Sequence, residues 1–215
     1  MDKKIGFIGA GNMASAIISG LISSGTGPSA LFVSDINSGK LDTLALSGVN
    51  VTQSSTDVVE HSDIIILAVK PNILPNVLGE IANSAINYKD KIFVSIAAGF
   101  TVSRMREILG HAVKSVRTMP NTPALIGKGM TVIAMDERLS ADEASAVTSI
   151  FASVGEVIRM DENFINAATA LHGSSPAYAY MLIDAMAKSG ERYGISKETA
   201  LKLSAQAVLG AAAMV

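Results

Sequence analysis

A glycine-rich turn stands near the start of the chain, in the segment Gly9-Ala10-Gly11-Asn12-Met13-Ala14. It follows an apolar run at residues 5–8 and opens a helical pattern over residues 13–23. Strand, glycine turn and helix in this order form the phosphate-binding unit of dinucleotide-binding proteins. The first glycine permits the tight turn, the second lets the backbone approach a pyrophosphate, and the final alanine allows close packing of the helix on the strand. The turn therefore predicts a bound dinucleotide at the helix N-terminus.

Asp35 stands at the end of the second expected strand, where an acidic side chain accepts a hydrogen bond from a ribose 2′-hydroxyl. Its charge repels a 2′-phosphate and favours NADH. Ser34, Asn37 and Lys40 indicate the opposite, because such side chains line phosphate pockets. The residues alone leave both cofactors open, and a glycine turn that binds nothing is the structural alternative.

The composition is typical of a cytoplasmic enzyme. A formal net charge of −2 gives no reason to expect nucleic acid or a membrane surface as a partner, and the absence of cysteine excludes disulfides and thiolate chemistry. The three histidines are scattered, so no metal site is expected. Lys3 and Lys4 before an apolar stretch resemble a secretory signal, but Gly9 and Gly11 interrupt its apolar core. The longest interior apolar run, residues 64–69, is far shorter than a membrane span.

Strand and helix patterns alternate as far as residue 159. The apolar runs at residues 64–67 and 92–94 are continuous, which is typical of strands buried on both faces of a parallel sheet. The pattern predicts an α/β fold with a doubly wound, mostly parallel sheet of Rossmann type. We expect strands at residues 4–8, 30–34, 49–52, 64–69, 92–96, 114–117, 131–134 and 156–159, and helices at residues 13–23, 40–47, 56–60, 73–85, 102–109 and, after a capping box at Ser140 and Glu143, to about residue 153.

Residues 161–215 carry helical patterns only, at 164–171, 176–193 and 197–215. We therefore expect a Rossmann domain over residues 1–160 and an all-helical domain over residues 161–215. The last helix is apolar on most sides, as buried helices are. We expect the helical domain to be truncated and this helix to be covered by a second subunit, in a homodimer or a ring of dimers.

Five segments then give the chain a specific resemblance. They are Ile8-Gly9-Ala10-Gly11-Asn12-Met13-Ala14, Leu67-Ala68-Val69-Lys70-Pro71, Ser95-Ile96-Ala97-Ala98-Gly99, Met119-Pro120-Asn121-Thr122-Pro123 and Gly173-Ser174-Ser175-Pro176-Ala177-Tyr178. In this order, and along the whole chain, they resemble the pyrroline-5-carboxylate reductases, the enzymes of the last step of proline synthesis. The resemblance implies hydride transfer from NADPH, with NADH as the alternative, to the C=N bond of a small imine acid, giving L-proline.

These segments also have physical roles. The segments after Leu67 and Ser95 follow buried strands, at the sheet edge where ligands bind in open α/β folds, although each is also an ordinary strand-to-helix turn. With the glycine turn they give the expected cofactor contacts: Gly9, Gly11, Asn12, Met13, Ser34, Asp35, Asn37, Ala68, Val69, Lys70, Pro71, Ala97, Ala98 and Asn121. The side chain of Asn121 either binds the nicotinamide or substrate or completes an Asx-type turn.

The substrate residues implied are Asn121, Gly173, Ser174 and Ser175. The last three form an expected loop that leads into a helix, which suits a substrate carboxylate but also simple N-capping by a serine. A protonated imine is already electrophilic, so a strong side-chain acid is not needed. Lys70, Thr169 and Ser174 are the candidate catalytic side chains that contact the imine nitrogen, whereas Tyr178 is interpreted as core.

The chain departs from the family pattern at His172 and Ser175, where relatives carry serine and glycine, and in lacking a later substrate-holding segment. His172 is interpreted as structural. Two alternative functions stay open. A β-hydroxyacid-type dehydrogenase shares this fold but needs a Lys–Asn pair that residues 176–193 do not contain. The other alternative is a non-catalytic NAD(P)-binding module.

Overall fold

The computed structural model describes residues 3–215. The chain divides into two compact units, Met1–Thr169 and Ala170–Val215. Each unit is described by itself below. The domain boundary expected between residues 160 and 161 stays a prediction.

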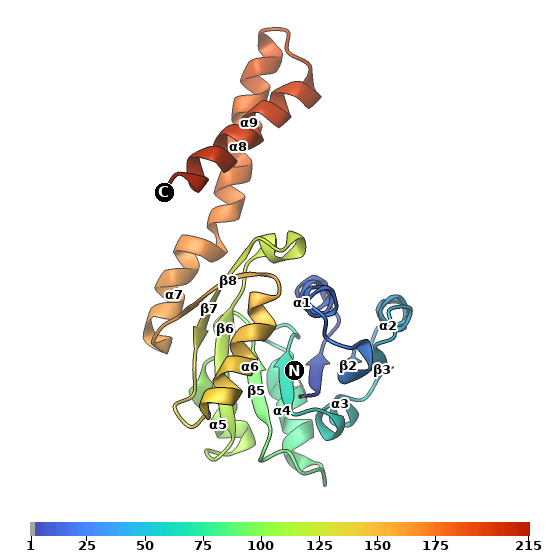
Figure 1. Cartoon of the computed structure of the whole chain (residues 1–215). Helices are drawn as coiled ribbons and strands as arrows, with labels where there is room; N and C mark the ends of the chain where they lie inside the picture. The colour runs from blue at the N-terminus through green and yellow to red at the C-terminus, as the bar shows by residue number, and fades with distance from the viewer. Residues whose placement is uncertain (1–2) are drawn as a thin grey trace. The chain divides into compact units, whose positions relative to one another are not determined.

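The first unit is built on one eight-stranded sheet in the order β3-β2-β1-β4-β5-β6-β7-β8 (Figure 1). All neighbouring strands pair in parallel except β6 and β7, so the expected mostly parallel sheet is confirmed. The order reverses beside β1, which lies between β2 and β4. The strands are β1 (Ile5–Ile8), β2 (Leu31–Ser34), β3 (Asn50–Thr52), β4 (Ile64–Leu67), β5 (Ile92–Ser95), β6 (Lys114–Met119), β7 (Gly129–Ala134) and β8 (Gly155–Arg159).

Helices cover both faces of this sheet, as the continuous apolar strands predict. Ile64 and Ile66 of β4 pack in one cluster with α1, α2 and α6, and Ile65 and Leu67 pack in another with α3, α4 and α5. The helices are α1 (Asn12–Ser23), α2 (Ser38–Ala45), α3 (Ser55–His61), α4 (Leu74–Asn83), α5 (Val102–Leu109) and α6 (Ala141–Ala152), with short 3₁₀ turns at Pro28–Ala30 and Thr122–Ile126.

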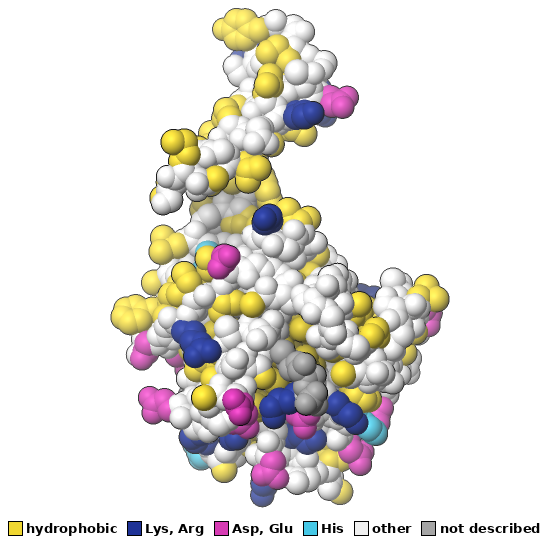
Figure 2. Space-filling model, viewed as in Figure 1, with side chains coloured by type: hydrophobic (Ala, Val, Ile, Leu, Met, Phe, Trp, Pro, Cys, Tyr) yellow, Lys and Arg dark blue, Asp and Glu magenta, His cyan; other side chains and the backbone are white. Residues whose placement is uncertain are grey.

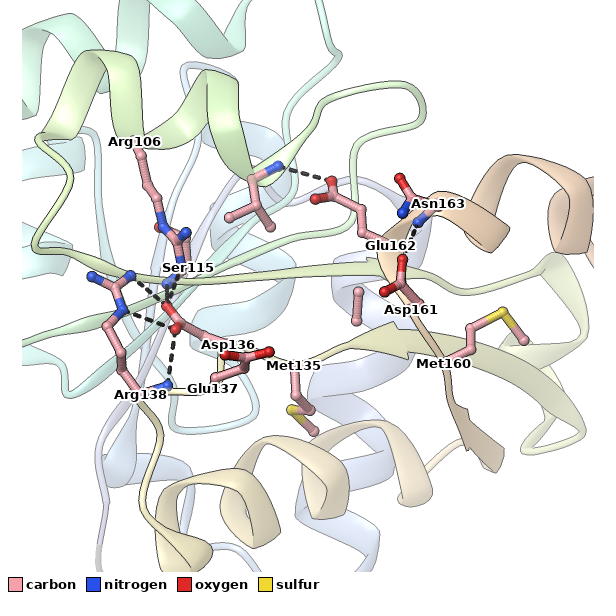
Figure 3. A pocket seen from close by; sticks show the side chains of 12 residues that line it. Arg106, Ser115, Met135, Asp136, Glu137, Arg138, Met160, Asp161, Glu162 and Asn163 are labelled. Atoms are coloured by element: carbon pink, nitrogen blue, oxygen red, sulfur yellow. Dashed lines mark hydrogen bonds and ion pairs between the residues drawn. The ribbon is translucent and has the colours of Figure 1, made fainter.

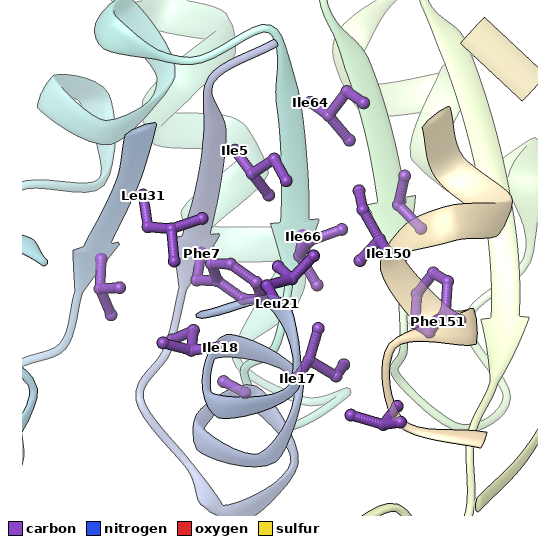
Figure 4. Packing of buried hydrophobic residues seen from close by; sticks show 14 of the residues in the cluster. Ile5, Phe7, Ile17, Ile18, Leu21, Leu31, Ile64, Ile66, Ile150 and Phe151 are labelled. Carbon is purple, nitrogen blue, oxygen red and sulfur yellow. The ribbon is translucent and has the colours of Figure 1, made fainter. Parts of the chain in front are cut away.

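The first cluster forms the centre of the unit (Figure 4). Phe7 of β1, Ile17 of α1 and Phe151 of α6 are fully buried in it. Burying one such side chain stabilises the fold by about 1.5–3 kcal/mol. The cluster therefore fixes α1, and with it the turn that precedes α1, against the middle of the sheet.

Local hydrogen bonds set the starts of several helices. The expected capping box at α6 is confirmed, with the Ser140 hydroxyl accepting from the Glu143 N–H and the Glu143 carboxylate accepting from the Ser140 N–H. Asn37 caps α2 through its side-chain oxygen, which accepts from the backbone N–H of Lys40 at 3.4 Å. This cap fixes the first turn of α2.

The second unit is a helical hairpin of α8 (Ser175–Arg192) and α9 (Lys197–Ala213). Gly194 turns the chain with a φ of 89°, and the Ser196 hydroxyl caps α9 by accepting from the Thr199 N–H. Small buried side chains, Ala187 and Ala200, lie where the two helices meet. Across residues 3–215, no helix is both long and apolar enough to span a membrane.

The prediction of a loop before α8 is wrong. The segment from Ile165 to Ala168 is the short helix α7, and a π-helical turn over Thr169–Gly173 continues to α8. Ser174 has helical backbone angles and makes no side-chain cap, so simple N-capping by this serine is wrong as well. The Ser175 hydroxyl instead donates to the Leu171 carbonyl. Short π-turns within helical segments often occur at functional sites.

The glycine turn yields a test of the fold. A Cβ at Gly9 would lie 2.7 Å from the Ala68 carbonyl oxygen, at a φ of 104°, whereas a Cβ at Gly11 has nothing within 4 Å. We expect Gly9→Ala to lower the free energy of unfolding by about 2–4 kcal/mol, through left-handed strain and overpacking. Gly11→Ala is the matched control and costs about 1 kcal/mol or less, as an N-cap change does. Urea unfolding of both variants measures this, and equal losses contradict the assignment of Gly9 as the constrained position.

Candidate functional site

An open cleft of ≈ 430 Å³ lies at the carboxyl ends of β1, β2, β3 and β4. This is the point at which the strand order reverses, where open α/β sheets bind ligands. Eight of the expected cofactor contacts line it, as does Lys40: Gly9, Gly11, Ser34, Asp35, Asn37, Ala68, Val69 and Lys70. The cleft thus brings together three segments that are far apart in the sequence.

Six further lining residues are missing from the sequence prediction: Ile8, Ile36, Gln53, Ser55, Ile73 and Val77. Gln53 and Ser55 follow β3, whose carboxyl end meets the same sheet edge as those of β1 and β2. The rule that ligands bind at the carboxyl ends of parallel strands would have found these two. Ile36 directly follows Asp35 and is almost fully exposed at the rim.

The remaining expected cofactor residues do not line the cleft: Asn12, Met13, Pro71, Ala97, Ala98 and Asn121. Asn12 is exposed at the first position of α1, and Ala97 is buried after β5. Asn121 is buried, and its side-chain oxygen accepts from the Met130 N–H at 2.8 Å, a partner that the sequence did not indicate. The cofactor roles of these six residues stay predictions.

Hydrogen bonds from the neighbouring strand hold the glycine turn in place. The Gly9 N–H donates to the Ser34 carbonyl at 2.7 Å, and the Ala10 N–H donates to Asp35 Oδ2 at 2.8 Å. A Cβ on Gly11, which lines the cleft, would point into open space. The turn is therefore fixed on its protein side and open on its cleft side, as a phosphate-binding turn must be.

Asp35 is held by several donors at once. Its Oδ1 accepts from the Asn37 N–H at 2.9 Å, and the Lys40 ammonium lies 3.7 Å from Oδ2. Partial burial acts to raise the pKa of Asp35, but the hydrogen bonds from Ala10 and Asn37 and the charge of Lys40 outweigh it and hold this pKa below its ordinary value. Asp35 is therefore a carboxylate at neutral pH.

The expected substrate and catalytic residues lie outside this cleft, apart from Lys70, which is exposed at its edge. The Thr169 hydroxyl donates to the Ile165 carbonyl at 2.7 Å. Ser174 is exposed in the second unit, and His172 and Gly173 are half-buried in the π-turn. Tyr178 is 64% exposed, so its interpretation as core is wrong for the single chain.

A second cavity of ≈ 530 Å³ lies in the first unit, around an ion cluster that the sequence did not predict (Figure 3). Asp136 is buried at its centre and accepts from Arg106 at 2.8 Å, from Arg138 at 2.6 Å and from the Ser115 N–H at 2.8 Å. Partial burial acts to raise the pKa of Asp136, but these donors outweigh it and hold the pKa far below its ordinary value. Arg138 also donates to the His111 and Val113 carbonyls. This cluster joins β6, β7 and α5 and is structural.

One surface group among residues 3–215 has ligand atoms close enough for a metal ion. Asp57, Glu60 and His61 of α3 bring such atoms within 4.8 Å of one another. The spacing of the histidines does not indicate this group, because two of its three residues are acidic. Asp57 and His61 also form an ordinary i,i+4 pair at 3.3 Å, both about half-exposed, and the group lies outside the cleft.

Sheet order, glycine turn and cleft together define a dinucleotide-binding protein of the Rossmann class. A family model described as NADP oxidoreductase, coenzyme F420-dependent, matches residues 4–99, and one described as pyrroline-5-carboxylate reductase dimerisation matches residues 162–215. The pyrroline-5-carboxylate reductase of Escherichia coli K12 is 43% identical over 100% of this chain and 80% of its own length. That of Arabidopsis thaliana is 37% identical over 99% of this chain and 76% of its own.

Solved structures agree with these relatives. A pyrroline-5-carboxylate reductase from Coxiella burnetii superimposes with a TM-score of 0.92 at 36% identity, covering 100% of this chain and 80% of that one. The Plasmodium falciparum enzyme, solved with NADP bound, gives 0.89 at 31% identity and covers 100% and 79%. The chain belongs to the pyrroline-5-carboxylate reductase family. This assignment confirms the resemblance and decides against the β-hydroxyacid-type alternative.

The ion cluster in the second cavity makes a prediction about pH. The pKa of Asp136 is lower in the folded chain than its unfolded value of about 4, so its stabilisation is present above that value and is lost as the pH falls further. We expect Asp136→Asn to lower the free energy of unfolding by about 2–4 kcal/mol at neutral pH. The difference from the wild type narrows below about pH 4.

Urea unfolding between about pH 7 and pH 3 measures this difference. Asp42→Asn, at an exposed carboxylate of α2, is the matched control and changes little. A deficit in Asp136→Asn that stays constant down to the lowest pH contradicts the assigned charge of Asp136.

Proposed function

We propose that this chain reduces 1-pyrroline-5-carboxylate to L-proline, with NADPH as the hydride donor. The cleft at the switch point carries the proposal, because it holds the glycine turn of a dinucleotide-binding protein within a chain of this family. The P. falciparum relative, solved with NADP, supports the choice of cofactor, and NADH is the alternative.

The residues of the cleft fit a dinucleotide. The open side of Gly11 and the free N–H groups at the start of α1 suit a pyrophosphate, and the end of β2 suits the adenosine ribose. The buried Ser34 hydroxyl lines the cleft and has no hydrogen-bond partner within the described chain. Ala68 directly follows β4, and its small side chain leaves room in the cleft.

When bound, NADPH supplies a hydride for the carbon of the C=N bond. The protein positions the reactants and excludes water. Lys70, Thr169 and Ser174 remain our candidates for contact with the imine nitrogen, and Asn121, Gly173, Ser174 and Ser175 for substrate binding. Lys70 is supported by its place beside the cleft, and Thr169 and Ser174 by their place in and after the π-turn.

A direct assay tests this function. Purified protein is mixed with NADPH and 1-pyrroline-5-carboxylate, and oxidation of the cofactor and formation of proline are followed together. Turnover that requires both reactants supports the proposal. Tight NADPH binding without any turnover instead favours the alternative of a non-catalytic NAD(P)-binding module.

Family membership of the helical segment indicates oligomerisation, and we propose a homodimer or a ring of dimers. Large apolar side chains are exposed over α8 and α9 (Figure 2), among them Tyr180, Met181, Leu203 and Leu209. Exposed apolar surface of this extent is typical of an interface, and two-fold pairing would bury the same surface on both subunits. A cytoplasmic location stays a prediction.

The glycine turn also predicts a binding defect. We expect Gly11→Val to abolish detectable NADPH binding while the fold persists, because the added side chain enters open space on the cleft side of the turn. A fluorescence titration with NADPH measures affinity, and circular dichroism checks the fold. Gly79→Val, at an open position of α4, is the control. Wild-type affinity in Gly11→Val rules out the phosphate-binding role of this turn.

The exposed surface of α9 predicts a defect in assembly. We expect Leu203→Asp to shift the protein from dimer or larger to monomer and to remove activity with it, because a charge in a buried apolar interface is strongly unfavourable. Sedimentation at the assay concentration measures the mass. Lys89→Asp, on an exposed loop of the first unit, leaves assembly unchanged. A fully active monomer is incompatible with the proposed dimer.

A further inference from the structure

Arg117 of β6 is a buried cation that lies outside the dinucleotide cleft, with only 3% of the residue exposed. Nη1 of its guanidinium lies 3.4 Å from Glu162 Oε1, and Nη2 donates to Asn166 Oδ1 at 2.8 Å. A buried charge is unfavourable unless it is paired and hydrogen-bonded. The guanidinium therefore ties β6 to two partners that lie 45 and 49 residues further along the chain.

Glu162 links a third element to this contact. The Oε1 atom that faces Arg117 also accepts the backbone N–H of Val102 at 2.9 Å (Figure 3). Val102 is the first residue of α5, and an N–H at this position has no partner within its own helix. One carboxylate oxygen therefore links the start of α5 to the guanidinium on β6.

Asn166 lies in α7, a helix that also packs on the sheet through apolar contacts. Ile165 and Ala168 of α7 are buried in one cluster with β7, and Met119 at the end of β6 packs against this cluster. Apolar burial is non-directional, whereas a hydrogen bond from a planar guanidinium fixes a direction. The bond to Asn166 therefore sets the position of α7 on the sheet, and with it that of Thr169, which follows α7 directly.

Three chain segments that carry expected site residues are thus joined through one buried guanidinium. They are the turn between β5 and α5, the end of β6, and α7. The expected site residues on or next to these segments are Ala97, Ala98, Asn121 and Thr169. The two partners of Arg117 belong to residues 162–215, which match the dimerisation model, whereas Arg117 itself is part of the Rossmann sheet.

We propose that Arg117 is a positioning residue for imine reduction: with Glu162 and Asn166 it holds these three segments in the arrangement that hydride transfer requires. The inference rests on the proposed function and gives Arg117 no contact with substrate or cofactor. A displacement of about 1 Å between reacting groups lowers a rate by about a hundredfold. Loss of the guanidinium therefore acts on the chemical step. NADPH binding is unaffected, because none of the three residues lines the dinucleotide cleft.

The kinetic constants of Arg117→Lys test this role. Lysine keeps the charge but lacks the planar fork, so it does not hold both partners in the same geometry. We expect kcat with 1-pyrroline-5-carboxylate to fall by about tenfold to a hundredfold, while the dissociation constant of NADPH stays at its wild-type value. Each variant is assayed well below its unfolding midpoint, so a purely structural role leaves kcat unchanged.

Three further variants sharpen the test. Asn166→Asp keeps an acceptor oxygen for the guanidinium and retains most of the wild-type kcat. Adding Glu162→Gln to Arg117→Lys lowers kcat by less than the two single effects multiplied together, because both changes break the same contact. Arg159→Lys is the matched control. This arginine of β8 donates to Thr148 of α6 at 2.6 Å, outside the three segments, and its variant keeps the wild-type kcat.

Hydrogen–deuterium exchange follows the arrangement without any turnover. In Arg117→Lys we expect faster exchange in α7 and at the start of α5, because the contacts that hold these segments are weakened. Exchange in α1 stays as in the wild type. Unchanged exchange in α5 and α7 overturns the network, whether or not the protein turns over.

Three kinetic results overturn the positioning role: a wild-type kcat in Arg117→Lys, a loss of kcat of the same size in Arg159→Lys, or a loss confined to NADPH affinity. Failure of the reductase function is seen separately. A wild-type protein that does not reduce 1-pyrroline-5-carboxylate, together with faster exchange in α5 and α7 of Arg117→Lys, disproves the function and keeps the network.

Discussion

The turn at Gly9 is the constraint on which the rest of the first unit depends. Its φ of 104° and the closeness of the Ala68 carbonyl leave no room for a side chain. The turn is tied to β2 through the Ser34 carbonyl and the Asp35 carboxylate, and β4 lies directly against it. Because the core packs α1 against the sheet, the start of α1 is fixed beside the cleft that Gly9 and Gly11 line.

Much of this architecture could be predicted from the sequence because it follows from short-range pattern. The continuous apolar runs of β4 and β5 imply burial on both faces, and all eight strands lie within a few residues of their expected places. The π-turn at Thr169–Gly173 could not be predicted, because a single π-turn between helices is too short to leave its own periodicity in the sequence. The helical backbone at Ser174 was not predicted either. A serine shortly before a proline is typical of an N-cap at the start of a helix, so the sequence favoured a loop there.

In the candidate site too, features set by local sequence were predicted and long-range interactions were not. Residues that directly follow a strand, such as Ser34, Asp35 and Ala68, were found because chain position alone fixes them at the sheet edge. Hydrogen-bond partners outside the same local segment were not predicted, because no local sequence pattern specifies them. The Asn121 side chain bonds to Met130, and Asp136 joins Arg106 to Ser115. Asp35 belongs to both groups. Its place at the end of β2 was predicted from the sequence, whereas the hydrogen bond that it accepts from the Ala10 N–H is seen only in the structure.

The second unit buries much less apolar side-chain surface within itself than the first unit does. The first unit buries entire Phe and Ile side chains in its clusters, whereas the buried side chains of α8 and α9 are the small Ala187, Ala200 and Ser204. Each contributes little apolar area, and a helical hairpin of this kind is marginal by itself in water. Its large side chains, including Tyr180, Met181 and Leu209, are exposed instead. In the proposed dimer, burial of these side chains against a second subunit would supply the missing stabilisation of the helical unit.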